Sequence, residues 1–289
     1  MIRFGVAANP DDFYDKGYKN SEDMPKYLYE FGLDCYEYQC SRGVRIKEEK
    51  ACKLGIEAKK YNIFLSIHAP YYISLSSQDT EKQEKSINYI LDTMQAAKWM
   101  GAKEIVVHAG SLLDLERTYA VECNCKMLKR VLNEARRRNL DDIRICPETM
   151  GKINQLGSSE EIIKMCMVDD NFIPTIDFGH LYCRSLGKLN TKEEWIRELS
   201  LYIDKLGFER MKHFHSHFSK MLFTNMGEKC HITFDKAKDI NNSGPDEIPV
   251  IEAILELGLE PNIFCESAGT QSFDSKYLKD ELLRLKNIL

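Results

Sequence analysis

The sequence predicts an α/β fold in which the whole chain, residues 1–289, forms one (β/α)8 TIM barrel. Two observations carry this prediction. Eight short runs rich in β-branched and aromatic residues recur along the chain, and longer segments with helical periodicity separate them. A length of 289 residues also suits eight such units, and no linker or internal repeat divides the chain into two domains.

The eight expected strands are the β-rich runs, taken in order: residues 2–7, 35–39, 63–68, 104–108, 143–148, 173–177, 211–215 and 262–266. Between them, residues 21–32 read as a helix with Ser21 as N-cap and Gly32 at its end. Residues 80–101 read as a longer helix, because apolar residues recur there at spacings of three and four.

The last residues of strands three to eight share a chemistry. In a (β/α)8 barrel the carboxyl ends of the strands meet at the mouth where active sites lie. Each residue alone has an ordinary explanation, as a histidine at the rim or a carboxylate at a helix N-cap. Imidazoles and carboxylates together are the ligands of zinc, manganese or iron, so the set predicts a metal site. Its members are His68, His108, Glu148, Asp177, His215 and Glu266.

Composition narrows the function classes. The formal net charge is −5, so no overall basic field indicates nonspecific nucleic-acid binding, although local basic loops remain compatible with it. The ten cysteines contain no CxxC pair, and the N-terminus lacks the apolar core of a signal peptide. No apolar run approaches the roughly 20 residues of a membrane span. We therefore expect a cytoplasmic protein, monomeric and not associated with membranes.

Six stretches of the sequence match one known family in order, and they cover most of the chain after about residue 60. They are HAPYYISL from His68, GAKEIVVHAGS from Gly101, PETMGK from Pro147, TIDFGH from Thr175, KHFHSHFSK from Lys212 and FCESAGT from Phe264. With these stretches the chain resembles the endonuclease IV family of abasic-site endonucleases, within the xylose-isomerase-like barrels.

The resemblance implies a cluster of up to three zinc ions. It assigns His68, His108 and Glu148 to the first ion. Glu148 also bridges to a second ion, whose other ligands would be Asp177, His215 and Glu266. His180 and His231 would belong to the third ion. Of the three alternating histidines, His215 would then be the ligand, His213 a packed residue one pleat deeper, and His217 a loop residue facing substrate or solvent.

The chain departs from the family at the third ion. Lys229 stands where the family has an aspartate, and a protonated lysine offers no lone pair to a metal. We therefore expect two zinc ions, and a third only if Glu228 takes the place of the aspartate. Alternatively, the Lys229 ammonium would itself occupy the vacancy. Manganese and iron are compatible with the same ligands.

The implied activity is metal-dependent hydrolysis of a phosphodiester in double-stranded DNA, 5′ to an abasic site, by a hydroxide that bridges two metals, as in DNA repair. The catalytic residues would be Glu148, Glu266, His231 and Lys229. The substrate-binding residues would be Tyr71, Arg42, Arg45 and His217. Tyr71 is equally compatible with packing at the barrel rim, and the two arginines with a solvated loop.

A sugar isomerase or epimerase is the alternative function. Related barrels hold one metal at the positions of Glu148, Asp177, His215 and Glu266, and paired glutamates move protons beside a carbonyl. His68 and His108 favour the hydrolase, whereas the acidic charge and Lys229 favour the isomerase. A third alternative is a metal-binding protein without catalysis.

Overall fold

The computed structural model describes residues 1–287, and in it eight parallel strands close into a barrel. Around the barrel the order is β1–β11–β7–β6–β5–β4–β3–β2. The strands are β1 (Arg3–Ala7), β2 (Cys35–Gln39), β3 (Phe64–His68), β4 (Glu104–His108), β5 (Arg144–Glu148), β6 (Thr175–Asp177), β7 (His215–Phe218) and β11 (Asn262–Cys265). The predicted fold class is confirmed.

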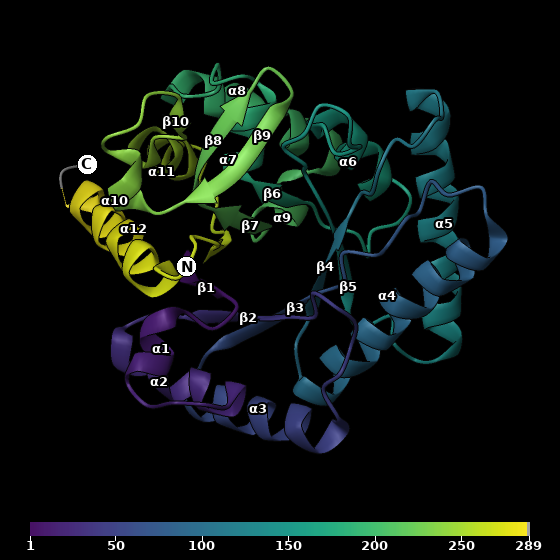
Figure 1. Cartoon of the computed structure of the whole chain (residues 1–289), viewed down its shortest axis with the longest axis horizontal. Coiled ribbons are helices and arrows are strands. Elements are labelled where there is room, and N and C mark those ends of the chain that lie inside the picture. The colour runs from purple at the N-terminus through teal and green to yellow at the C-terminus, as the bar shows by residue number, and fades with distance from the viewer. Residues whose placement is uncertain (288–289) are drawn as a thin grey trace.

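Helices form the outer layer and follow the chain around the barrel (Figure 1). They are α1 (Asp11–Asp15), α2 (Met24–Phe31), α3 (Glu48–Lys60), α4 (Thr80–Met100), α5 (Arg117–Arg137), α6 (Ser159–Cys166), α7 (Phe178–Arg184), α8 (Lys192–Leu206), α9 (Phe208–Met211), α10 (Phe234–Ala237), α11 (Glu247–Glu256) and α12 (Gln271–Lys286). A short 3-10 turn, Ser21–Asp23, precedes α2, so Ser21 is not the N-cap that the sequence predicted. Gly32 and Gly101 end α2 and α4 in the left-handed conformation, as expected.

Strand seven differs from its prediction. The sequence predicted residues 211–215, but Met211 ends α9 and β7 runs from His215 to Phe218. The alternating pattern extends on both sides of His215, so periodicity alone could not fix the boundaries of the strand. Because the strand starts later, His217 and not His215 lies beside Asp177 of β6.

A small antiparallel sheet follows β7 and was not predicted. It consists of β8 (Lys220–Thr224), β9 (Gly227–Ile232) and β10 (Ser243–Gly244), in the order β10–β8–β9. The β8–β9 hairpin projects from the barrel beside α7 (Figure 1). Its turn pairs with the β5–α6 loop through the backbone of Lys152 and Gly227, so the hairpin is held over the mouth of the barrel.

Within residues 1–287, no helix combines the length and the apolar character needed to cross a bilayer.

The barrel leaves no space for a side chain at Gly5 of β1. A Cβ there would lie 1.7 Å from the carbonyl oxygen of Cys35 on β2. We expect Gly5→Ala to lower the free energy of unfolding by about 3 kcal/mol or more, because two paired strands must separate to admit the methyl group. Gly17→Ala is the matched control, since Gly17 has a positive φ but open space around it, and should cost about 1–2 kcal/mol. Urea unfolding followed by circular dichroism measures both, and equal losses would contradict this account of the packing.

Candidate metal centre

Three groups of histidine and carboxylate side chains meet at the carboxyl ends of the strands. In each group the atoms that can bind a metal lie within 4.8 Å of one another. The first group is His68, His108 and Glu148. The second group is Glu148, Asp177, His217 and Glu266. The third group is His180, Glu228 and His231.

Glu148 belongs to two groups because its two oxygens face opposite ways. Oε2 lies 3.3 Å from Nε2 of His68 and 3.2 Å from Nε2 of His108. Oε1 lies 3.1 Å from Nδ1 of His217 and 3.5 Å from Nδ1 of His180. The side chain is fully buried, which by itself raises the pKa of the carboxyl, but His217 and His108 hold that pKa well below its usual range. A charged carboxylate with one oxygen toward each group is the arrangement of a bridging ligand.

The second group contains His217 in the place predicted for His215. Nδ1 of His217 lies 3.1 Å from Glu148 and 3.6 Å from Glu266, and its ring is fully buried rather than in a loop. His215 lies one pleat deeper in the barrel, where its Nδ1 faces Glu104 at 3.2 Å. His213 precedes the strand and is exposed, so the prediction that it is a packed residue is wrong. All three corrections follow from the later start of β7.

A β-bulge completes the third group. Leu222 pairs with Cys230 and Phe223 pairs with Glu228, so Lys229 is left over as the extra residue of β9. In a regular strand Lys229 would share a face with His231. The bulge turns Lys229 outward, where it is exposed, and brings Glu228 to the face of His231. The structure therefore does not place Lys229 in the catalytic position that the sequence predicted.

Glu228 also approaches the other histidine of the third group. Its Oε2 lies 3.6 Å from Nε2 of His180, which occupies the first turn of α7. The approach is close because Gly151, in the β5–α6 loop, has no side chain: a Cβ there would lie 2.7 Å from Cβ of Glu228.

Three histidines of the centre are fixed through one ring nitrogen. Nδ1 of His68 lies 2.8 Å from the carbonyl of Ala69, and Nδ1 of His180 lies 2.8 Å from the carbonyl of Thr149. A carbonyl only accepts, so both Nδ1 atoms carry hydrogen and leave Nε2 to bind a metal. Nδ1 of His231 is likewise hydrogen-bonded, to Oγ of Ser219 at 2.8 Å.

Asp177 provides a test of whether these residues suit a cation. Its Oδ1 accepts a 2.7 Å hydrogen bond from the backbone N–H of His180, so it caps α7. Its Oδ2 is buried in the second group and accepts no hydrogen bond, although Nδ1 of His180 lies 3.3 Å away as an ion-pair partner. An unsatisfied buried carboxylate oxygen is costly, and a divalent cation at this position would satisfy it. The donors are imidazole nitrogens and carboxylate oxygens, which suit zinc, manganese or iron.

The groups open into a cavity of about 290 Å³. Tyr71 forms part of its wall, with its ring centroid 5.6 Å from that of His68 and 5.3 Å from that of His108. Arg42 and Arg45 are exposed in the β2–α3 loop and do not line this cavity. Lys152 does line it, although the sequence analysis did not single it out.

A larger cavity of about 480 Å³ lies elsewhere, beside α10, α11 and α12. Its buried cation, Lys220, donates 2.6 Å and 2.7 Å hydrogen bonds to Glu247 and to the carbonyl of Pro245. Because the charge of Lys220 is already paired, the smaller cavity, which the histidines and carboxylates line, is the better candidate for an active site.

Metal binding to this centre should release protons. Burial lowers the pKa of the His180 imidazole, but Asp177 and Glu148 raise it to about 10. A metal must therefore displace a proton from His180 at neutral pH, and the apparent affinity should rise with pH until about pH 10. We expect about a tenfold gain per pH unit for each proton displaced. Zinc titration calorimetry in two buffers of different ionisation enthalpy measures this release, and an affinity independent of pH between 7 and 9 would contradict it.

The bulge predicts different effects for two adjacent residues. Glu228→Ala should remove one metal ion per chain, because it deletes a side chain of the third group. Lys229→Ala, its matched control, should leave the metal content unchanged, because Lys229 points away from the group. Elemental analysis of zinc-loaded protein after gel filtration gives both counts, and the opposite pattern would show that β9 has the regular register.

The sequence of the chain matches one protein family and several relatives. A model of the xylose isomerase-like TIM barrel family matches residues 25–287. An uncharacterized protein of Methanocaldococcus jannaschii is 31% identical over 92% of both chains. A probable endonuclease 4 of Mycoplasma pneumoniae is 32% identical, over 53% of this chain and 52% of its own length.

Solved structures show the same fold. Endonuclease IV from Thermus thermophilus superposes with a TM-score of 0.70 at 16% identity, over 98% of this chain and 99% of its own. A D-tagatose 3-epimerase-like protein superposes equally well, with a TM-score of 0.70 at 18% identity, over 99% of this chain and 98% of its own. The match over residues 25–287 agrees with the closed barrel and with the side chains at its strand ends: the chain belongs to the xylose isomerase-like TIM barrel family.

Proposed function

We propose that this protein is a metal-dependent phosphodiester hydrolase that cleaves double-stranded DNA 5′ to abasic sites. The observation that carries the proposal is the position of Glu148 between His68 and His108 on one side and His217 on the other. One carboxylate shared by two sets of ligands suits two neighbouring metals. Such a pair activates water and stabilises the attacking and leaving oxygens of a phosphoryl displacement.

The proposal assigns roles to the residues around the cavity. Glu148, Asp177, His217 and Glu266 would hold one ion, and His68 and His108 with Glu148 a second. His180, Glu228 and His231 would hold a third, and zinc suits all three sets. Tyr71 would contact the substrate at the mouth, and Lys152 would place a cation near a phosphate oxygen. Without cations the carboxylates of the cavity would repel a phosphodiester, so metal binding must precede substrate binding.

Two kinds of relative support DNA as the substrate. The probable endonuclease 4 of Mycoplasma pneumoniae shares 32% identity over 160 residues, and endonuclease IV from Thermus thermophilus shares the whole fold. Arg42 and Arg45 are exposed on the loop after β2, in which the carbonyl of Ser41 accepts a 3.5 Å hydrogen bond from the backbone N–H of Tyr71 in the cavity wall. This position supports contact of the two arginines with a docked duplex.

Sugar epimerisation is the second candidate, and the size of the cavity favours it. About 290 Å³ suits a small molecule without any further opening, and the fold matches a D-tagatose 3-epimerase-like protein as closely. In that reaction Glu148 and Glu266 would move protons beside a carbonyl, and one ion in the second group would suffice. His68 and His108 would then have no catalytic role.

Cleavage of a 5′-labelled duplex with one tetrahydrofuran abasic site tests the proposal, with zinc counted on the same sample. We expect nicking that is lost on chelation, with two or more ions per chain. Glu148→Ala should reduce the rate at least about 1,000-fold and remove at least one ion, because it deletes a ligand of two groups. Glu256→Ala, at an exposed glutamate of α11, is the control. No nicking, a single ion and epimerisation of a ketohexose would overturn the hydrolase in favour of the epimerase.

A further inference from the structure

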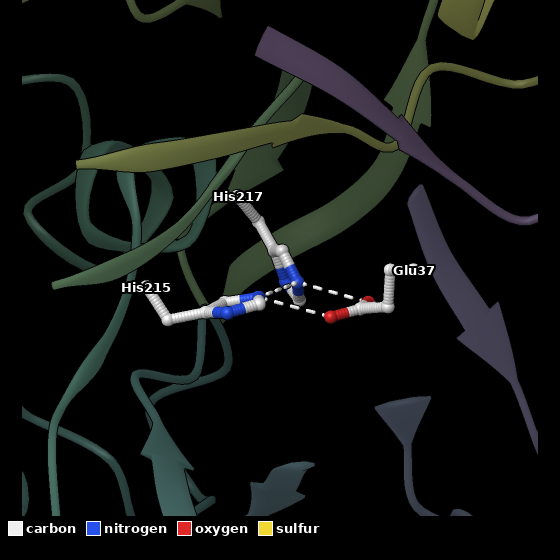
Figure 2. A group of neighbouring side chains, drawn as sticks. All are labelled: Glu37, His215 and His217. Atoms are coloured by element: carbon white, nitrogen blue, oxygen red, sulfur yellow. Dashed lines mark hydrogen bonds and ion pairs between the residues drawn. The ribbon is translucent and has the colours of Figure 1, made fainter. Parts of the chain in front are cut away.

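A chain of buried polar side chains continues below the metal centre into the barrel. Glu37 of β2 lies between two histidines of β7 (Figure 2). Its Oε2 is 2.9 Å from Nε2 of His215, and its Oε1 is 3.1 Å from Nε2 of His217. All three side chains are fully buried. The two Nε2 atoms come within 3.3 Å of each other because both face the same carboxylate.

Both oxygens of the Glu37 carboxylate have close polar partners. Oε1 accepts from Nε2 of His217 and, at 3.0 Å, from Nε2 of Gln39. Oε2 accepts, at 3.1 Å, from Oγ of Ser66, and it forms a 2.9 Å ion pair with Nε2 of His215. A carboxylate offers about four lone-pair sites, and three hydrogen bonds and one ion pair surround those of Glu37. Donors from β2, β3 and β7 therefore fix the orientation of this group.

His215 links Glu37 to a second carboxylate. Its Nδ1 lies 3.2 Å from Oε2 of Glu104 on β4, so each ring nitrogen faces one carboxylate. Its ring also stacks on Phe264 of β11, with centroids 4.6 Å apart and an angle of 13° between the planes. Packing and hydrogen bonds together leave the imidazole a single position.

This arrangement determines which nitrogen of His217 faces the metal centre. Both ring nitrogens face carboxylates: Nε2 donates to Glu37, and Nδ1 points at Glu148 and Glu266. When a metal takes the place of the hydrogen on Nδ1, the bond to Glu37 keeps the remaining hydrogen on Nε2, so Nδ1 is the nitrogen that binds. His68 and His180 are held by neutral backbone carbonyls, whereas His217 is held by the charged carboxylate of Glu37. A carboxylate partner fixes the tautomer of a metal-binding histidine and increases its basicity.

We propose that Glu37 is a positioning residue that directs Nδ1 of His217 at the second group, and that His215 and Glu104 hold Glu37 in place. This inference rests on the proposed metal centre but not on the choice between DNA and a sugar as substrate. Glu37, Glu104, His215 and His217 lie on β2, β4 and β7, so the strands of the barrel, and no loop, hold the arrangement.

A further metal ion among Glu37, His215 and His217 is the competing explanation, since their atoms lie close enough to hold one. The donors on Glu37 argue against it. Gln39 and Ser66 already donate to the two oxygens of Glu37, and Nε2 of His217 donates to Oε1 as well. An ion here would have to displace two hydrogen bonds to a carboxylate.

Zinc affinity and the protonation of the His217 ring test the proposal. In Glu37→Gln, one oxygen becomes an NH2 group that cannot accept from an imidazole, so the negative charge and one of the two acceptors between His215 and His217 are lost. We expect the ion of the second group to bind about 10- to 100-fold more weakly in competition with a chromophoric chelator. The ion at His68 and His108 should bind as before. Glu247→Gln is the matched control, since it alters a carboxylate paired with Lys220 outside the centre.

Wild-type protein gives a measurement that does not depend on the folding of a variant. Long-range ¹H–¹⁵N spectra of the zinc-loaded protein should show His217 with hydrogen on Nε2 and zinc on Nδ1. Zinc on Nε2, or unchanged affinity in a folded Glu37→Gln, would overturn the proposal. So would an additional ion in wild type that Glu37→Gln removes. Wild type that binds no zinc would overturn the metal centre itself, and this inference with it.

Discussion

The carboxylate of Glu148 is the interaction on which the rest of the centre depends. It lies at the end of β5, and β4 and β7 bring histidines to its two oxygens. His108 faces it because β4 and β5 pair in register at these two residues. His217 faces it from β7, across β6. A change in the register of any of these strands would therefore separate the two groups, because successive side chains of a strand point to opposite faces.

The centre also depends on polar groups that the barrel buries beneath it. Burying Glu37, Glu104 and His215 costs free energy unless their polar atoms are paired, and each of the three has such partners. At the mouth of the barrel the centre also depends on the β8–β9 hairpin, because the bulge at Lys229 places Glu228 beside His180 and His231. The ligand sets thus draw on local capping, on strand pairing and on buried ion pairs at once.

The sequence predicted the barrel and most of the strand ends, because β-rich runs and terminal polar residues are local signals. It did not predict where strand seven begins, since an alternating pattern continues on both sides of His215 and only α9 limits it. The bulge at Lys229 could not be predicted from the sequence either, because it depends on how the hairpin docks on the β5–α6 loop. The role of Glu37 needed the fold, as its partners come from strands distant in sequence.

Anomalous diffraction at the zinc absorption edge, from crystals of the zinc-loaded protein, tests the central claim most directly. The account predicts two peaks that flank the Glu148 carboxylate, roughly 3.5–4 Å apart, with one ion on the side of His68 and the other on the side of His217. It predicts a third peak among His180, Glu228 and His231. A single peak among Glu148, Asp177, His217 and Glu266, with none beside His68 and His108, would contradict it. Glu148 would then be the ligand of one metal, and the case for a phosphodiester hydrolase would lose its main support.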